Sequence, residues 1–304
     1  MKVSRVLSWS VVVICVTLLA GTVAGCNSFS NDEEQRLPVA TLNAVEEIAD
    51  KYGYDAENEE LTPVYVIAPK FHDPRDGLAR DLLAQQCLAG VVEYPVMPQG
   101  GWHPYAHPRT QQPIFDLEIA TEYGYPYLRN IEGYSSEHTS QPVSEEQLDA
   151  MIKCGERTDN RLGDAPDRLL VEIEAAGWEY SESDAELNKA IEDWRKCMDP
   201  LGIPDMHDKP APLPPKSLVP DAFEATEVGD DAIGTVPLTE REREVAIVDA
   251  TCRDKVDYDY ALHVARAKGE LIAIGSDLES FEATRVALDK YFENVEAVLA
   301  EFGK

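Results

Sequence analysis

The sequence contains few basic residues for its length. Across 304 residues, 27 Lys and Arg stand against 57 Asp and Glu, which gives a formal net charge of −30. Nucleic-acid binding depends on Lys and Arg to neutralise phosphates, so this balance argues against nucleic acid as a partner and also disfavours lying flat on anionic lipid. The acidic excess favours solubility; a basic partner or loose binding of divalent cations are the alternatives.

The sequence also lacks recognisable catalytic and cofactor motifs. It has no G-x-S-x-G element and no Gly-rich phosphate loop after a strand pattern. No two cysteines are spaced as C-x-x-C, so neither a zinc site nor thioredoxin-like chemistry is indicated. With this many acidic residues, carboxylate pairs arise by chance and no general acid–base pair can be singled out. We therefore predict no enzymatic activity and no cofactor.

No hydrophobic run is long enough to span a membrane. The apolar run Val11–Ala20 is shorter than the roughly 20 residues that a transmembrane helix needs. Lys2 and Arg5 precede it and Val23-Ala24-Gly25-Cys26 follows it, a pattern typical of a signal peptide that ends in a bacterial lipobox. The alternative is an uncleaved amino-terminal anchor, which would not require a cysteine after the small residues.

Cys26 is therefore predicted to be the first residue of the mature protein and the site of lipidation. Two or more acyl chains, such as palmitate, hold a protein stably at a bilayer, whereas one chain gives marginal binding. We expect 1–25 to be a signal peptide, 26–38 a lipid-anchored flexible tether, and 39–304 a single α-rich extracytoplasmic domain. The 44% content of hydrophobic residues is sufficient for a core in that domain.

Four cysteines remain for the extracytoplasmic domain: Cys87, Cys154, Cys197 and Cys252. An even number of cysteines outside the cytoplasm predicts disulfide bonds. Four cysteines allow three pairings, and composition does not choose among them.

Hydrophobic periodicity predicts a mainly α-helical domain with long irregular Pro-rich loops. Apolar residues recur at helical spacing in several ranges, namely 41–52, 75–92, 114–123, 144–153, 169–176 and 187–198. We expect Cys154-Gly155 to end the preceding helix or to open the next element, Gly177 to end the helix that precedes it, and Val64–Ile67 to form an isolated short strand. Residues 94–113 read as an irregular loop, and 199–238 as a Pro-rich and acidic connection inside the domain.

The carboxy-terminal part carries the strongest helical patterns. Thr239 with Glu242 matches a capping box at the start of a long helix. After Gly269 and Gly275, apolar residues from Leu278 to Phe302 alternate at spacings of three and four, interrupted only by Arg285. This seam predicts a helix that packs lengthwise on another, in a helical hairpin or helix pair. Packing within the chain is the favoured interpretation, and self-association or a coiled-coil partner is the alternative.

Short motifs around the cysteines resemble those of a group of secreted actinobacterial proteins. Asp193–Met198 resembles their D-W-x-x-C-M helix, Val245–Cys252 resembles their A-V-A-D-x-x-C helix, and Ala120–Tyr125 is similar to their A-x-x-Y-G-Y segment. Cys154-Gly155-Glu156 matches G-C-x-G-E-A in part, with Lys and Arg in place of the first Gly and the Ala. Gln86-Cys87 with the downstream Tyr-Pro matches C-M-x-x-x-G-F-x-Y-P without its Gly-Phe.

The resemblance covers roughly residues 75 to 302 in order. It implies a helix-rich, usually lipid-anchored fold in which Cys87 pairs with Cys154 and Cys197 with Cys252. It brings no activity, because the family is one of unknown function.

Two groups of residues are weak candidates for a binding site. His103 and His107 could form a metal pair, but they lie in a Pro-rich segment where the helical i, i+4 geometry is absent. Trp102, Tyr105, Tyr123 and Tyr125 could stack on sugar rings of the cell wall. Ordinary loop and packing roles are the favoured interpretation of both groups.

These observations together predict a lipid-anchored surface protein at the extracytoplasmic face of the membrane. The favoured function is a non-enzymatic interaction or accessory module, with an envelope or transporter complex as its possible partner. The alternatives are a lipoprotein that binds a solute or a cell-wall glycan, and a wall-directed hydrolase.

Overall fold

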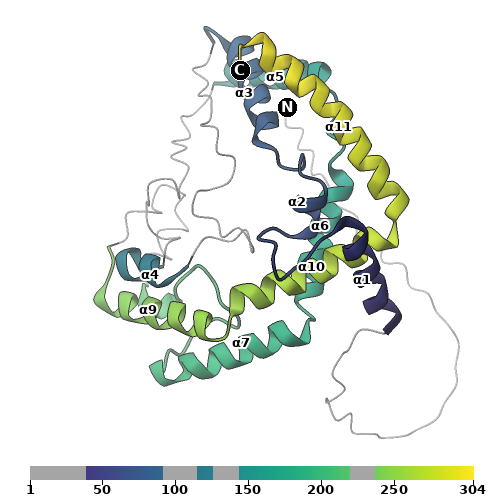
Figure 1. Ribbon diagram of the computed structural model, residues 1–304. Helices are drawn as coiled ribbons and strands as arrows, with labels where there is room; N and C mark the ends of the chain where they lie inside the picture. The colour runs from purple at the N-terminus through teal and green to yellow at the C-terminus, as the bar shows by residue number, and fades with distance from the viewer. Residues whose placement is uncertain (1–38, 92–114, 126–143, 220–236) are drawn as a thin grey trace, which may run out of the picture. The chain divides into compact units, whose positions relative to one another are not determined.

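The computed structural model describes residues 39–91, 115–125, 144–219 and 237–304 (Figure 1). Every regular element in these ranges is a helix, which confirms the predicted mainly α fold. Residues Gln35–Lys304 form one compact unit.

The described residues of the first half of the unit contain six helices, most of which follow the predicted ranges. They are α1 (Val39–Tyr52), α2 (Pro63–Ile67), α3 (Pro74–Leu88), α4 (Leu117–Tyr123), α5 (Glu145–Leu162) and α6 (Arg168–Ser181). Side chains cap several of these helices; the Ser144 hydroxyl accepts from Gln147 N–H and the Gln147 side chain accepts in return from Ser144 N–H. This reciprocal pair satisfies two backbone donors at the start of α5.

In the second half, the described residues form four long helices and two short 3₁₀ turns. These are α7 (Ala185–Met198), η2 (Asp199–Leu201), η3 (Lys216–Leu218), α9 (Glu240–Lys255), α10 (Tyr258–Ser276) and α11 (Leu278–Glu301). The predicted carboxy-terminal helix pair is present as α10 and α11.

The expected strand at Val64–Ile67 is wrong, because these residues belong to the helix α2. Pro63 occupies the first turn of that helix, where a missing N–H costs nothing. The side chains of Val64, Tyr65 and Ile67 are all buried. Four apolar residues do not distinguish a strand from a short buried helix, and the described part of the chain offers no strand for pairing.

Several glycines lie inside helices, including Gly177, where the sequence predicts a helix end. Gly155 is within α5, Gly177 within α6, and Gly269 and Gly275 within α10. A Cβ on Gly269 would lie 2.6 Å from Cβ of Tyr180 and 2.9 Å from the carbonyl oxygen of Ala176. Gly177 and Gly269 therefore allow α6 and α10 to cross closely, and this packing outweighs the helix penalty of glycine, roughly 1 kcal/mol.

Helix α10 is the central element of the unit. It contacts α6 most extensively and also packs on α1, α7, α9, α2 and α11 (Figure 1). Its buried residues lie around much of its circumference. A helix buried in this way needs neighbours on several faces, which the other helices supply.

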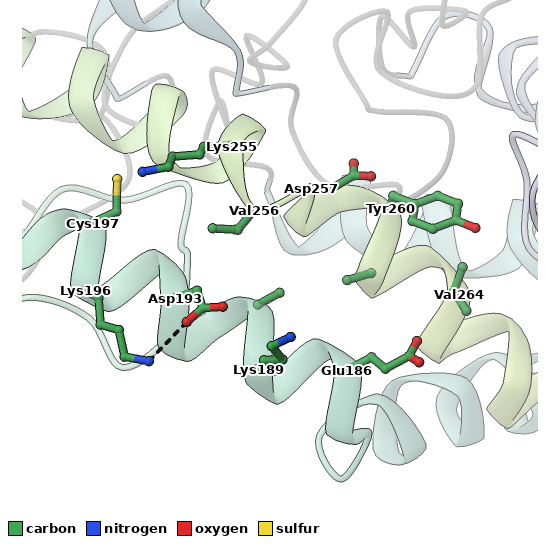
Figure 2. Close-up of a pocket in the computed structure, with 12 residues that line it drawn as sticks. Glu186, Lys189, Asp193, Lys196, Cys197, Lys255, Val256, Asp257, Tyr260 and Val264 are labelled. Carbon is green, nitrogen blue, oxygen red and sulfur yellow. Dashed lines mark hydrogen bonds and ion pairs between the residues drawn. The ribbon is translucent and has the colours of Figure 1, made fainter.

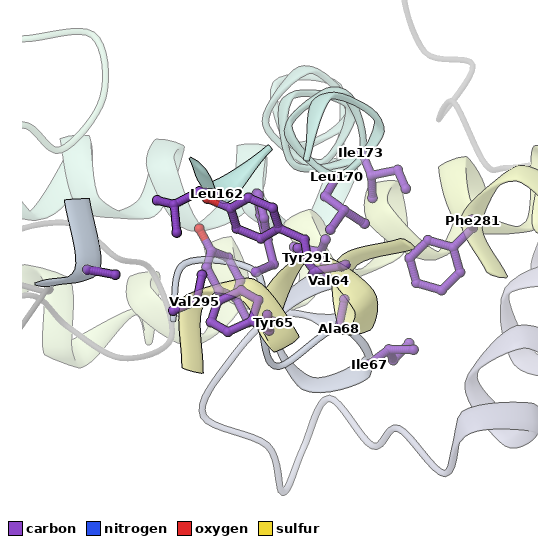
Figure 3. Close-up of a cluster of buried hydrophobic side chains, with 14 of the residues drawn as sticks. Val64, Tyr65, Ile67, Ala68, Leu162, Leu170, Ile173, Phe281, Tyr291 and Val295 are labelled. Carbon is purple, nitrogen blue, oxygen red and sulfur yellow. The ribbon is translucent and has the colours of Figure 1, made fainter. Parts of the chain in front are cut away.

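The largest hydrophobic cluster is formed by α1, α2, α3, α6, α10 and α11. Figure 3 shows part of it, including Tyr291 and Val295 of α11 with Leu170 and Ile173 of α6. The predicted seam of α11 faces inward, since Phe281, Phe292 and Val295 are at most 1% exposed. Arg285 does not pack in the apolar seam. Its Nη1 lies 3.0 Å from Oε2 of Glu282, and its guanidinium lies over the ring of Tyr52.

Two smaller clusters complete the core. One joins α4, α7 and α9 and includes the fully buried Trp194 and Met198. The other joins α7 to the amino-terminal half of α10 through Leu187, Leu262 and Ala265. Helix α7 is thus fixed by α9 at one end and by α10 at the other.

The close crossing of α6 and α10 gives a first testable prediction. Gly177→Ala would place a Cβ 2.8 Å from Cγ of Glu270 and 3.0 Å from the carbonyl oxygen of Arg266. Such overpacking should destabilise the fold by roughly 2 kcal/mol. Gly155→Ala is the matched control in α5, because nothing lies within 4 Å of its added Cβ. The control should gain up to about 1 kcal/mol. Urea denaturation compares the two, and equal effects would contradict the role of Gly177.

Candidate functional site

The two disulfides each join a pair of neighbouring helices. Cys87–Cys154 links α3 to α5 and Cys197–Cys252 links α7 to α9, each with Cα atoms 5.8 Å apart. The predicted disulfide bonds, and the pairing that the family resemblance implied, are confirmed. They close loops with sequence separations of 67 and 55 residues. In the chain-entropy model, each disulfide adds about 4 kcal/mol to the free energy of unfolding. Such bonds indicate an oxidising, extracytoplasmic environment.

A buried carboxylate lies beside the second disulfide, and we call its surroundings the Asp249 cluster. Asp249 is 2% exposed. Its Oδ1 accepts from Trp194 Nε1 at 2.8 Å and from Arg253 Nε at 2.8 Å. Its Oδ2 accepts from the Tyr125 hydroxyl at 2.9 Å and from Arg253 Nη2 at 3.0 Å. Both carboxylate oxygens are satisfied, so the cluster ties α7, α9 and the end of α4 together.

The Asp249 cluster gives Tyr125 a structural role instead of the ligand-binding role considered from the sequence. Tyr125 is 1% exposed and its ring stacks on Phe115 at a centroid distance of 5.1 Å. Burial and the Asp249 carboxylate raise the pKa of its hydroxyl well above the usual value. Burial lowers the pKa of the Arg253 guanidinium, but the Asp249 carboxylate raises it by more, so the pKa lies above its usual value. Tyr123 is partly buried and packs against the hydrophobic cluster that joins α4, α7 and α9.

A second set of buried charges, the Glu270 cluster, lies at the crossing of α6 and α10. It comprises Glu270, Arg266, Glu174 and Tyr65. Glu270 and Arg266 are both 0% exposed. Nη2 of Arg266 lies 3.7 Å from Oε1 of Glu270 and 3.6 Å from Oε1 of Glu174. The Tyr65 hydroxyl donates to Glu174 at 2.7 Å.

The Glu270 cluster also fixes the start of α2. Oε2 of Glu270 accepts from the backbone N–H of Val64 at 3.0 Å, and the Arg266 guanidinium lies 4.0 Å from the ring centroid of Trp178. Burial raises the pKa of Glu270 to about 7 and lowers that of Arg266. Because these groups bind one another inside the core, we infer that the cluster has a structural role.

The third feature is open to solvent: a groove of about 700 Å³ between α7 and the bend that joins α9 to α10, which we call the α7 groove (Figure 2). This volume falls within the range of small-molecule sites. Lys189, Asp193 and Lys196 line it from α7, while Lys255 and Asp257 line it from the bend. The half-buried Cys197 forms part of the wall, so the second disulfide fixes the spacing of the two sides. The α7 groove is the candidate functional site.

Several predicted site residues lie outside the described residues. These are Cys26, Trp102, His103, Tyr105 and His107. Within the described ranges, no group of three or more His, Cys, Asp or Glu side chains is arranged to hold a metal ion. None of the described helices combines the length and the apolar character needed to cross a bilayer.

Sequence reasoning missed the residues of the Glu270 cluster and of the α7 groove. For the cluster a signal existed: Arg266 and Glu270 are spaced i, i+4 between the apolar residues Leu262 and Ile274, where a charged pair is unexpected. Lys189 and Lys196 share one face of α7, and this spacing is visible in the sequence. The approach of Lys255 from another helix requires the tertiary structure.

Comparison of the chain with protein-family models, with curated proteins and with solved structures finds no match in any of the three. The function proposed below therefore rests on the residues of this chain.

Substitution of the buried carboxylate tests the Asp249 cluster. Asp249→Asn removes the charge that compensates Arg253 and replaces one acceptor oxygen with an NH2 donor that faces other donors, so it should cost about 3 kcal/mol of unfolding free energy. Asp254→Asn, on the exposed side of the same helix, should change stability by less than about 0.5 kcal/mol. Thermal and urea unfolding of both variants provides the comparison. A stability loss at Asp249 no larger than that at Asp254 would show that the cluster is not required.

The raised pKa of Glu270 predicts a specific dependence of stability on pH. Between its ordinary value of 4.5 and its folded-state pKa of about 7, the native state binds this proton more tightly than the unfolded state. The contribution of Glu270 to stability is therefore greatest below pH 4.5 and is lost as pH rises through 7. Glu270→Gln cannot titrate, so the stability of the wild type relative to this variant should rise by roughly 2 kcal/mol from pH 8 to pH 5.

Urea unfolding of both proteins at several pH values measures this difference. Glu293→Gln, on the exposed face of α11, controls for the removal of one surface carboxylate. A difference that does not change between pH 8 and pH 5 would show that Glu270 is ionised throughout that range.

Proposed function

We propose that the protein is a lipid-anchored, non-enzymatic interaction module at the extracytoplasmic face of the cell membrane. The observation that carries the proposal is the combination of a lipobox cysteine, Cys26, with a helical unit closed by two disulfides. Disulfides of this kind persist outside the cytoplasm. A lipidated Cys26 would keep the unit at the membrane surface, where it can meet envelope proteins.

The placement of the charged residues supports a binding role over a catalytic one. Asp249 and Glu270, the buried carboxylates of the two clusters, both accept hydrogen bonds from the protein itself. A general acid or base must reach a proton on the substrate. Neither carboxylate lines the α7 groove, whose charged residues lie at the surface.

A second candidate function, the binding of a solute or of a wall fragment, is favoured by the α7 groove itself. Its volume of about 700 Å³ falls within the range of small-molecule sites. Its walls are held by the Cys197–Cys252 disulfide and by the hydrogen bond from Trp194 to Asp249. Such walls are already ordered before a ligand arrives, which reduces the entropic cost of binding.

The anchor is tested by Cys26→Ser. The wild-type protein should carry acyl chains on Cys26 and sediment with membranes, whereas the variant should appear in the soluble extracytoplasmic fraction. Cys87→Ser, which leaves Cys26 intact, is the matched control and should stay with the membrane. Mass spectrometry of the amino-terminal peptide measures the acylation. An unmodified Cys26 in the membrane-bound protein would contradict lipid anchoring.

The interaction role is tested by cross-linking of the tagged protein in its native membrane. We expect a single envelope or transporter complex to be enriched with the anchored form and depleted with Cys26→Ser. Enrichment that is equal for both forms, or an absence of cross-linked partners, would contradict an accessory role that depends on the membrane.

A further inference from the structure

A second pocket, of about 520 Å³, lies at the bend between α9 and α10, and we call it the Tyr258 pocket. Its walls come from Phe115–Leu117 at the start of α4, from the last turns of α9, and from Asp257–Tyr260 at the start of α10. Asp257 and Tyr260 also line the α7 groove, so the two pockets adjoin. The volume of the Tyr258 pocket falls within the range of small-molecule sites.

The charged groups that line the Tyr258 pocket are four carboxylates and one guanidinium. The carboxylates belong to Asp116, Asp254, Asp257 and Asp259, and the guanidinium belongs to Arg253. Arg253 is already bound by Asp249, through N–O distances of 2.8 Å and 3.0 Å. The lining therefore has a net charge of three negative units, whereas the charged groups of the α7 groove balance. A pocket lined in this way attracts cations.

Three of these carboxylates are not engaged by a basic residue of the protein. Asp116, Asp254 and Asp257 form no ion pair with any residue in the described ranges, and all three residues are exposed. Asp116 caps α4 by accepting from Ile119 N–H at 2.8 Å, which leaves its charge uncompensated. The negative potential of the pocket is thus available to a ligand.

The hydroxyl of Tyr258 adds a directional contact to this potential. Tyr258 is 3% exposed, and its hydroxyl forms no hydrogen bond with any of the described residues. The oxygen is also absent from the fully enclosed, unpartnered side-chain atoms of the described ranges, so it keeps access to the pocket that Tyr258 lines. Buried hydroxyl groups normally have a hydrogen-bond partner. This one is free to bind a ligand.

The pKa of Tyr258 shows which charged groups lie near its hydroxyl. Burial raises this pKa to about 12; the Arg253 guanidinium lowers it and the Asp259 carboxylate raises it. The hydroxyl therefore lies close to two charged groups of the pocket wall. It stays protonated at neutral pH, and its oxygen can accept a hydrogen bond from a cationic donor.

We propose that the Tyr258 pocket binds a primary alkylammonium group. One N–H of the ammonium donates to the Tyr258 hydroxyl, and the carboxylates of Asp254, Asp257 and Asp259 attract its charge. An ammonium carries three N–H donors, which suits a wall made of acceptors. The Tyr258 hydroxyl gives the site its orientation, and the carboxylates give it its preference for positive charge.

Other cations fit the pocket less well. A quaternary ammonium has no N–H donor and depends on the faces of aromatic rings. The Phe115 ring already lies 4.4 Å from the Arg253 guanidinium and stacks on Tyr125. A metal ion needs several converging ligands, and among the described residues no three His, Cys, Asp or Glu side chains are arranged in that way.

This inference goes beyond the proposed function, because it depends neither on the lipid anchor nor on the α7 groove. The ammonium group could belong to a small free amine or to a lysine side chain of a peptide. Both present the same alkylammonium arm, and the experiment separates them.

The test is a titration of the mature chain carrying Cys26→Ser, followed by NMR chemical shifts of the isotope-labelled protein. The four probes are N-acetyl-lysine amide, its trimethylated form, the neutral N-acetyl-norleucine amide, and n-butylamine. At least one of the two primary amines should bind saturably, and about tenfold or more tighter than the norleucine and trimethyl-lysine probes. Tighter binding of the lysine amide identifies a peptide side chain, whereas tighter binding of n-butylamine identifies a free amine.

Tyr258→Phe tests the directional contact. The variant keeps the ring that packs on Leu187 and Leu262 and removes only a hydroxyl without a partner in the described ranges, so thermal unfolding should be unchanged. Binding of the primary amine should nevertheless weaken about tenfold, because the ammonium loses its acceptor. Unchanged binding in a folded Tyr258→Phe protein would overturn the proposal.

A pair of double variants separates the pocket from the general negative charge of the chain. Asp254→Asn with Asp257→Asn should weaken binding about fivefold, and Asn tolerates the left-handed backbone of position 257, whose φ is 52°. Glu279→Gln with Glu293→Gln removes the same charge from exposed positions of α11 and should leave binding unchanged. Added salt should weaken binding to the unsubstituted pocket, since three of its carboxylates are exposed.

Four outcomes would each contradict an alkylammonium site at Tyr258. They are equal weakening by the two double variants, binding of the neutral norleucine probe as tight as that of the amines, tighter binding of the trimethyl-lysine probe, and no saturable binding of either primary amine. None of them bears on the membrane fractionation of Cys26→Ser, so this proposal and the proposed function fail separately.

Discussion

The close crossing of α6 and α10 is the contact on which the rest of the helical unit depends. Gly177 and Gly269 remove the side chains that would separate the two helices, and Arg266 and Glu270 fill the space beside the crossing. Glu270 then holds the start of α2 through the N–H of Val64. The larger hydrophobic cluster forms around this contact and includes α1, α3 and α11. Burial of a charged pair costs free energy of desolvation, and the hydrogen bond to α2 and the contact with Trp178 offset part of that cost.

The Asp249 cluster plays the corresponding role around α9, the helix that precedes α10. It joins α4, α7 and α9, while the Cys197–Cys252 disulfide joins the latter two covalently. The residues that the family resemblance singled out, Trp194, Asp249 and Tyr125, meet here in one hydrogen-bond network. Their spacing in the motifs is thus explained by structure: a carboxylate that accepts from three side chains requires all three partners in place. The same network fixes both walls of the α7 groove.

The sequence allowed the helices, the disulfides and the inward-facing seam of α11 to be predicted, because these depend on local periodicity and on the number of cysteines. It did not allow the ends of α5 and α6 to be predicted. Gly177 is tolerated inside α6 because the packing that it permits outweighs the small helix penalty of glycine, and the exposed Gly155 costs α5 no more than that penalty. The short α2 was mistaken for a strand for a similar reason, since only its burial against α10 and α6 decides its conformation. The α7 groove is lined jointly by α7, the end of α9 and the start of α10, which no local pattern encodes.

The whole chain carries a net charge of −30, whereas the three lysines and three carboxylates that line the α7 groove sum to zero. At physiological ionic strength, charges more than about 8 Å apart in solvent are largely screened. A ligand in the groove is therefore affected chiefly by the groups that line it, and only weakly by the net charge of −30. Arg253 and Arg266 are held by internal carboxylates, so they cannot serve an external anion. Lys189 and Lys255 are not held in this way by the described residues, and they lie next to an apolar floor. This difference between buried, paired arginines and exposed, uncompensated lysines is what distinguishes the groove from the structural charge clusters.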